Sequence, residues 1–228
     1  MKRNPDSPVL RHVLAQFAAA SGNFDLALEQ YKQLNAAAPN SEPIQLSLAA
    51  IYNAQGNTKE ALPILEKVAA ANPKSAAASL QLARTLVAER RLSDAKIHYR
   101  HVLELEPDNP TALNDLAYLM ADAGENLDEA LTFANRGMRS VSDPGVKKSL
   151  SDTLGWIYLK KNKDDSALQI FQTLVKNDPQ NATYHYHLAA TLYQKGDKKQ
   201  ARTELEAALA AKPGSPDEPK IRDLLARL

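Results

Sequence analysis

The chain has 228 residues, with 28 lysines and arginines against 27 aspartates and glutamates, so its formal net charge at pH 7 is only +1. This balance disfavours partners that recruit proteins through clustered positive charge, such as nucleic acids and anionic membranes. The absence of cysteine excludes a disulfide framework and a thiolate metal site, and it is compatible with both the cytoplasm and the periplasm. No segment approaches the roughly 18 apolar residues that a membrane-spanning helix needs, so we expect no membrane insertion.

Prolines recur along the chain at a nearly constant spacing. Five of them fall at intervals of 34, 34, 72 and 34 residues, and the long interval equals 34 plus 38, which is two repeats with an insertion: Pro39, Pro73, Pro107, Pro179 and Pro213. A period of this size is typical of stacked helical hairpins, in which no unit buries its own apolar face. Aligning the chain on these prolines predicts a single array over residues 8–215 with six repeats: 8–41, 42–75, 76–109, 110–147, 148–181 and 182–215.

The first helix of the array follows a segment that contains Lys2 and Arg3 but no apolar run, which does not fit a secretion signal. The helix carries an apolar band wider than a terminal helix with one packed side needs: Val9, Leu10, Val13, Leu14 and Phe17. One explanation of this wide band is that further repeats precede this chain in a longer polypeptide. The alternative is that no repeat is missing.

Each repeat has the same internal pattern. Apolar or small residues recur at repeat positions 4, 7, 8 and 11, and again at positions 20, 24 and 27, so that two helices, A and B, face each other. A turn residue lies between the two helices. Glycine is favoured there because it tolerates the left-handed backbone conformation. The third and fifth repeats have Arg90 and Asn162 there; asparagine is a tolerated substitute, whereas arginine costs stability. The other four repeats have glycine: Gly22, Gly56, Gly124 and Gly196.

The fifth repeat carries the fullest motif: Leu154, Gly155, Trp156, Ile157, Tyr158, Ala167, Phe171 and Pro179. In these residues the chain resembles the tetratricopeptide repeat family, whose pattern combines L-G-x2-Y, A-x3-F and a late proline. Six such matches in phase cover nearly all of residues 8–215. The resemblance implies an all-α fold, namely a right-handed α-solenoid of about six helix-turn-helix repeats. It also implies an inner, concave face lined by the A helices, which in this family commonly holds peptides or protein segments.

The fourth repeat departs from the pattern. It has one extra residue between Gly124 and Ala130, and a Ser-Asp-Pro-Gly turn at 142–145 replaces the single late proline, so we expect altered local geometry. Segments 114–120 and 152–156 also resemble repeats of bacterial exported proteins that are associated with exopolysaccharide systems. This second resemblance implies an alternative function, as a regulatory or assembly segment of a longer bacterial protein in envelope polysaccharide export.

The end of the chain, residues 216–228, has one apolar stripe made of Ile221, Leu224, Leu225 and Leu228. A terminal capping helix needs one docked face and one solvated face. We therefore predict a C-terminal capping helix.

The sequence has none of the motifs that carry catalysis: no Gly-rich phosphate loop, H-E-x-x-H, G-x-S-x-G or calcium loop. We expect a non-enzymatic protein with no small-molecule substrate, no cofactor and no metal. His98 and His101 could present two imidazoles, but two ligands do not complete a metal site, so solvated histidines are favoured. The carboxylates Asp115 and Asp152 lie on neighbouring A helices, where an open groove gives too little burial for acid–base catalysis. They are interpreted as an acidic element of a binding groove or as solvated surface.

The groove is the candidate site. If positions 4, 7, 8 and 11 face the partner helix, positions 2, 5, 9 and 12 and their neighbours line the opposite, concave side of helix A. Trp, Tyr and Arg contribute much of the energy of protein interfaces, about 2 kcal/mol or more for a good anchor. An alternative is that Trp156 and Tyr118 pack against the next A helix. The predicted peptide-binding residues are Gln81, Arg84, Asn114, Asp115, Tyr118, Asp152, Trp156, Tyr186, His187 and Tyr193.

Six lysines fall in corresponding turns of the fifth and sixth repeats: Lys160, Lys161, Lys163, Lys195, Lys198 and Lys199. They could form a positive ridge that steers an acidic partner or RNA, but solvated turn lysines are the favoured interpretation. The leading hypothesis is a monomeric, non-enzymatic scaffold that binds a peptide or protein segment in the concave groove.

Overall fold

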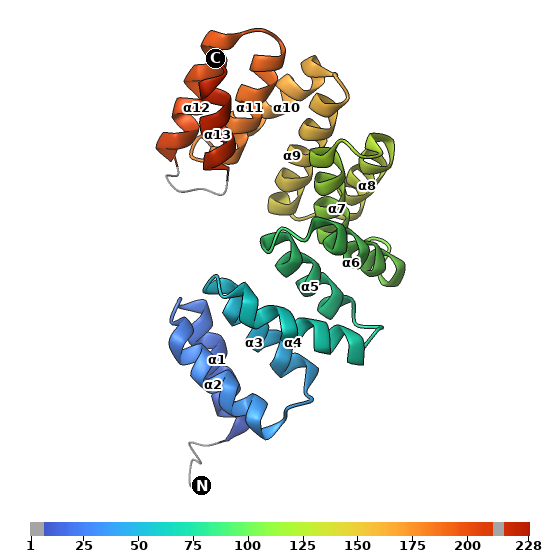
Figure 1. Ribbon diagram of the computed structural model, residues 1–228, viewed down its shortest axis with the longest axis vertical. Helices are drawn as coiled ribbons and strands as arrows, with labels where there is room; N and C mark the ends of the chain where they lie inside the picture. Colours follow the sequence, from blue (N-terminus) through green and yellow to red (C-terminus); the bar gives the residue numbers. More distant parts are fainter. Residues whose placement is uncertain (1–6, 212–216) are drawn as a thin grey trace. The chain divides into compact units, whose positions relative to one another are not determined.

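The computed structural model describes residues 7–211 and 217–228. Three features discussed above lie outside these residues: the leading segment with Lys2 and Arg3, Pro213, and the boundary predicted between the last repeat and the capping helix at 215/216. The described residues form thirteen α-helices and contain no strand (Figure 1). None of these helices is both long and apolar enough to cross a membrane.

The chain divides into two compact units, residues 1–107 and 108–228, which are termed the N-unit and the C-unit and are described separately. The N-unit has three helical hairpins: α1 (Pro8–Ala20), α2 (Phe24–Ala37), α3 (Glu42–Ala54), α4 (Thr58–Ala71), α5 (Ala76–Ala88) and α6 (Leu92–Leu105). The C-unit has three more and a final helix: α7 (Pro110–Ala123), α8 (Leu127–Ser140), α9 (Pro144–Lys160), α10 (Asp164–Asn177), α11 (Ala182–Gln194), α12 (Lys198–Ala211) and α13 (Glu218–Ala226).

Within each unit every helix packs against the next one in the chain (Figure 1). Contacts also join successive A helices, namely α3 with α5 in the N-unit, and α7 with α9 and α9 with α11 in the C-unit. The A helices α3, α5, α9 and α11 are thus each packed between their own B helix and the preceding hairpin. These contacts confirm the predicted all-α array of stacked helical hairpins.

Small residues at repeat positions 8 and 20 bring the two helices of a hairpin close together. Fully buried alanines occupy these positions: Ala15, Ala27, Ala49, Ala61, Ala83, Ala95, Ala117, Ala130, Ala167, Ala189 and Ala201. Gly155 replaces alanine at position 8 of the fifth repeat, and a Cβ atom there would lie 2.7 Å from the ring of Phe171. The Phe171 ring of the fifth hairpin therefore occupies the space that an alanine methyl group would need at position 155.

The turn between helices A and B takes the left-handed backbone in every repeat. Gly22 and Gly56 have φ of 77°, and Gly124 and Gly196 have 71° and 86°. Arg90 and Asn162 adopt the same region, with φ of 61° and 56°. The predicted turn positions are confirmed, and the third repeat holds arginine in a conformation that disfavours a Cβ atom.

The fourth repeat shows the expected irregularity. The chain accommodates the additional residue before Ala130 in the turn at Asn126, which has φ of 37° and caps α8. Helix α9 begins at Pro144, and the Asp143 carboxylate caps it by accepting a hydrogen bond from the Val146 amide. The boundary predicted at 147/148 therefore lies inside α9, because Asp143 and Pro144 form a helix start rather than a turn.

Candidate protein-binding surface

The C-unit contains an aromatic cluster centred on His187 of α11. Its imidazole stacks on the Trp156 ring with 4.4 Å between centroids, and the Phe171, Tyr186 and Tyr118 rings lie at 5.4, 5.5 and 6.3 Å. Trp156 and Tyr186 also contact each other at 6.1 Å. Residues from α7, α9, α10 and α11 thus converge on one imidazole.

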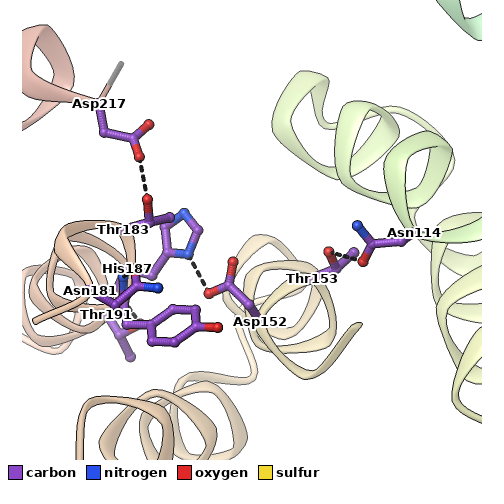
Figure 2. Close-up of polar contacts among 9 residues, drawn as sticks. Asn114, Asp152, Thr153, Asn181, Thr183, His187, Thr191 and Asp217 are labelled. Atoms are coloured by element: carbon purple, nitrogen blue, oxygen red, sulfur yellow. Dashed lines mark hydrogen bonds and ion pairs between the residues drawn. The ribbon is translucent and has the colours of Figure 1, made fainter. Parts of the chain in front are cut away.

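Polar contacts connect the A helices beneath this cluster. His187 donates from Nδ1 to the Asp152 carboxylate at 2.8 Å, which joins α11 to α9 (Figure 2). Thr153 donates to the Asn114 side-chain oxygen, also at 2.8 Å, which joins α9 to α7. A carboxylate can only accept a hydrogen bond, so the proton in this contact is assigned to Nδ1 of His187.

His187 differs from its predicted role. It is completely buried, so it is part of the packing between A helices and does not line an open groove. Position 6 of an A helix lies one residue beyond position 5 and turns about 100° away from the lining positions, toward the preceding A helix. Asp115, at the same position of α7, is partly buried and accepts a hydrogen bond from its neighbour Asn114 at 3.1 Å.

Two polar atoms of the cluster have no hydrogen-bond partner among the described residues, namely Trp156 Nε1 and His187 Nε2. Trp156 is only 4% exposed. Its large buried area favours the alternative in which the indole packs against the next A helix, and its remaining surface lines the pocket described next.

A pocket of about 340 Å³ opens between α9, α11 and α13. Its walls include Trp156, Tyr186 and Tyr193 from the predicted set, whereas the predicted Tyr118 does not line it. On α11 these walls come from repeat positions 5, 9 and 12, which are the positions predicted to line the groove. The other lining residues are Leu159, Lys160, Ala190, Gln194, Lys220, Asp223, Leu224 and Arg227. We term this cavity the aromatic pocket.

Helix α13 forms one wall of the aromatic pocket. Its Ile221 side chain is completely buried, and Thr183 of α11 donates to Asp217 at 2.7 Å just before the helix (Figure 2). Lys220 donates to Asp122 of α7 at 3.4 Å. The sequence pattern identified the apolar stripe of this segment but not its polar wall residues, because a docking direction cannot be read from one amphipathic helix.

Burial and nearby carboxylates shift two tyrosines of this region. Desolvation, followed by the negative charges of Asp122 and Asp217, raises the pKa of Tyr186 to about 12. The same two causes raise the pKa of Tyr118 well above its ordinary range. Both phenols therefore stay neutral at any physiological pH.

The remaining predicted residues lie in the N-unit. Gln81 and Arg84 line a pocket of about 430 Å³ between α3 and α5, together with Ala50, Asn53 and Thr85. Asn53 donates to Thr85 at 2.8 Å across the two helices. The structure thus places Gln81 and Arg84 in a separate pocket of the N-unit, which alanine and threonine side chains also line.

The two histidines singled out on the third repeat line a third pocket, of about 600 Å³, at the outer side of α4 and α6. His101 contacts the Pro73 carbonyl at 2.7 Å and Glu104 at 3.2 Å, and these contacts raise its pKa. Burial lowers the pKa of His98. Within residues 7–211 and 217–228, no group of three metal-ligating side chains comes together.

The lysine-rich turns are partly neutralised. Lys161 pairs with Asp128 and Lys195 with Asp165, while Lys160 lies 4.9 Å from the centroid of the Trp156 ring. These contacts weaken the positive ridge, which leaves the lysines as surface residues with local partners.

Comparison with known families identifies the repeat. A family model described as tetratricopeptide repeat matches residues 80–142 and 153–216, which together are more than half of the chain. Two further models with the same description match residues 52–97 and 8–33.

Two curated proteins are similar to parts of the chain. Protein STIP1 homolog of Dictyostelium discoideum is 30% identical over 95 residues, which are 40% of this chain and 17% of that protein. Cellulose synthase operon protein C of Pseudomonas fluorescens (strain SBW25) is 27% identical over 134 residues, which are 57% of this chain and 10% of that protein. The chain thus spans less than a fifth of the length of either relative.

Solved structures show the same fold at low sequence identity. The Cut9–Hcn1 hetero-tetramer of the APC/C matches 99% of this chain and 43% of its own, with a TM-score of 0.82 and 17% identity. MamA protein matches 78% of this chain and 94% of its own, with a TM-score of 0.61 and 21% identity. YrrB, described as a protein with an unusual peptide-binding site, matches 89% and 100%, with a TM-score of 0.60 and 16% identity.

Proposed function

Because the chain belongs to the tetratricopeptide repeat family, whose repeats indicate a protein–protein interaction scaffold, we propose that its C-unit binds a peptide segment of a partner protein in the aromatic pocket. The observation that carries this proposal is the composition of the pocket wall. Trp156, Tyr186 and Tyr193 come from two neighbouring A helices and surround a volume of about 340 Å³. Concave sites with apolar walls and a few polar groups are the usual form of a binding site.

The wall provides both contact area and direction. Aromatic side chains offer a large surface at low cost in side-chain entropy, so one apolar or aromatic residue of the partner is the expected anchor. Lys160 lies at the same wall and provides a polar group for the peptide backbone. The solved structure of YrrB, which has the same fold, is described as having a peptide-binding site, and this supports the class of ligand.

A selection experiment with matched variants tests the proposal. A phage library of random peptides is selected against the chain, and the enriched peptides are measured against two variants, Ala190→Arg and Ala50→Arg. Ala190 lines the aromatic pocket and Ala50 lines the N-unit pocket, and both occupy position 9 of their repeats. The proposal predicts loss of binding to Ala190→Arg and retention by Ala50→Arg. If the peptides bind both variants as tightly as the parent, or lose binding only to Ala50→Arg, the aromatic pocket is not the site.

A second candidate function is assembly of an envelope polysaccharide export system. The similarity to cellulose synthase operon protein C is the observation that favours it. In this alternative the chain acts as a segment of a larger bacterial protein and binds another component of the system. Direct binding of the purified chain to purified polysaccharide synthase subunits tests it, and absence of binding to any of them removes this alternative.

A further inference from the structure

Helix α1 presents an uncovered apolar face. Of the seven large hydrophobic side chains that are exposed among the described residues, five lie on this one helix: Val9 71%, Leu10 50%, Val13 56%, Leu14 42% and Phe17 72%. Single exposed hydrophobic residues are normal on protein surfaces, whereas a contiguous group usually marks an interaction site.

The repeat register identifies this face as a stacking face. Leu10, Leu14 and Phe17 occupy positions 3, 7 and 10 of the first repeat. At these positions two later A helices have side chains that are at most 9% exposed: Ala78, Leu82 and Thr85 in α5, and Tyr184, Leu188 and Thr191 in α11. At the same positions Ile44 of α3 and Leu154 of α9 are partly buried. In those helices the preceding hairpin covers the face. The face of α1 therefore has the shape and composition that receives another helix of this array.

Within the described residues, α1 carries five of the seven exposed large hydrophobic side chains, so the same face of a second copy offers the most apolar surface to match it. At the other end of the array Ile221 of α13 is completely buried against the last hairpin, so that stacking surface is already covered. The charge of α1 permits close approach of two identical helices. Arg11 is its only Lys, Arg, Asp or Glu residue, and Arg11 donates to Gln30 of α2.

We propose that two copies associate through their α1 faces about a twofold axis, with Val13 and Leu14 near the axis and Phe17 of each copy against the opposite end of the partner helix. An interface in which the same patch serves both subunits is self-complementary and closes as a dimer. This state differs from the monomer that the sequence predicts, and it does not depend on the proposed peptide site. Five side chains from each copy make an interface below the standard size of about 1,600 Å², so the dimer dissociates on dilution.

Sedimentation velocity of the full chain over a dilution series measures this association. The expected result is a monomer–dimer equilibrium. Phe17→Glu, which places like charges at the interface, should weaken it about tenfold or more. Ile97→Glu is the matched control, because Ile97 is 65% exposed and α6 carries just one other exposed large hydrophobic side chain, Leu92, five residues away. A chain that stays monomeric at every concentration, or a Phe17→Glu variant that dimerises like the parent, overturns the proposal.

Cysteine cross-linking tests the symmetry of the pairing. The chain has no cysteine, so single substitutions report on one contact each. Val13→Cys should form a covalent dimer under mild oxidation because residue 13 meets itself near the axis, whereas Ile97→Cys should stay monomeric. Dimers that form in solution while Val13→Cys does not cross-link would place the interface elsewhere and contradict the α1 pairing.

Discussion

The Nδ1 atom of His187 lies 2.8 Å from the Asp152 carboxylate, and this hydrogen bond joins α11 to α9 beneath a layer of aromatic rings. The histidine is completely buried and the side chain of Asp152 is 13% exposed. A buried polar pair of this kind is stabilising only while both members are present, because a buried group that loses its partner keeps the full cost of its desolvation.

Removal of the carboxylate should therefore destabilise the C-unit. In Asp152→Ala neither ring nitrogen of His187 has a partner, and we expect a loss of about 1–3 kcal/mol in the free energy of unfolding. Urea denaturation at pH 7 measures it. Asp165→Ala is the control, because its ion pair with Lys195 is at the surface, where removal should leave stability unchanged. Equal stability of Asp152→Ala and the parent would mean that the buried hydrogen bond contributes nothing.

The close approach of α9 and α10 depends on the missing side chain of Gly155. In Gly155→Ala the new methyl group would meet the Phe171 ring at 2.7 Å, and Phe171 is completely buried, so overpacking should cost about 1–3 kcal/mol. Thermal unfolding measures this loss. Adding Phe171→Leu should be less damaging in the Gly155→Ala background than in the parent, since the ring is the clashing group. Additive losses in the double variant would contradict the clash.

Arginine in the left-handed turn of the third repeat is an avoidable strain. Replacing Arg90, at φ of 61°, with glycine should raise the free energy of unfolding by about 1 kcal/mol, since the relief of the Cβ clash exceeds the added entropy of the unfolded chain. Asn162→Gly should gain less, because asparagine tolerates this region. Gly56→Ala should lose stability at the equivalent turn. Chemical denaturation midpoints compare the three variants, and a destabilised Arg90→Gly would contradict the strain.

Alkaline pH should weaken the wall of the aromatic pocket. The pKa of Tyr186 is raised to about 12, whereas an unfolded tyrosine ionises near 10. Between these values the unfolded chain releases a proton that the folded chain retains, so stability is complete below pH 10 and falls as the pH rises toward 12, by on the order of 2 kcal/mol. Tyr186→Phe should remove this part of the pH dependence, as measured by urea denaturation over that range. An unchanged dependence in the variant would show that Tyr186 is not shielded.

The array could be predicted from the sequence because its information is periodic. Each apolar position is repeated about every 34 residues, so six weak patterns reinforce one another, and the turn positions of Arg90 and Asn162 follow from alignment with the glycines. The turn predicted at 142–145 is wrong, because Pro144 begins α9. Asp143 is the residue that identifies it as a helix start, since its carboxylate caps the Val146 amide.

The site could be predicted only in part. Tyr186 and Tyr193 line a pocket as their positions indicate, whereas His187 is packed inside, because a difference of one residue on a helix turns a side chain by about 100°. The contacts of Lys220 and Asp217 depend on how α13 docks, and an amphipathic stripe does not define that direction. The peptide-binding role of these residues stays a prediction.

Several polar links in this chain span about one period of the array, such as Asn53 to Thr85, 32 residues apart, and Asp152 to His187, 35 residues apart. Each link ties a hairpin to its immediate neighbour, so the cost of disorder is local. Hairpins at an end of such an array can unfold while its middle stays folded, and a partner that binds two adjacent hairpins would oppose this local unfolding.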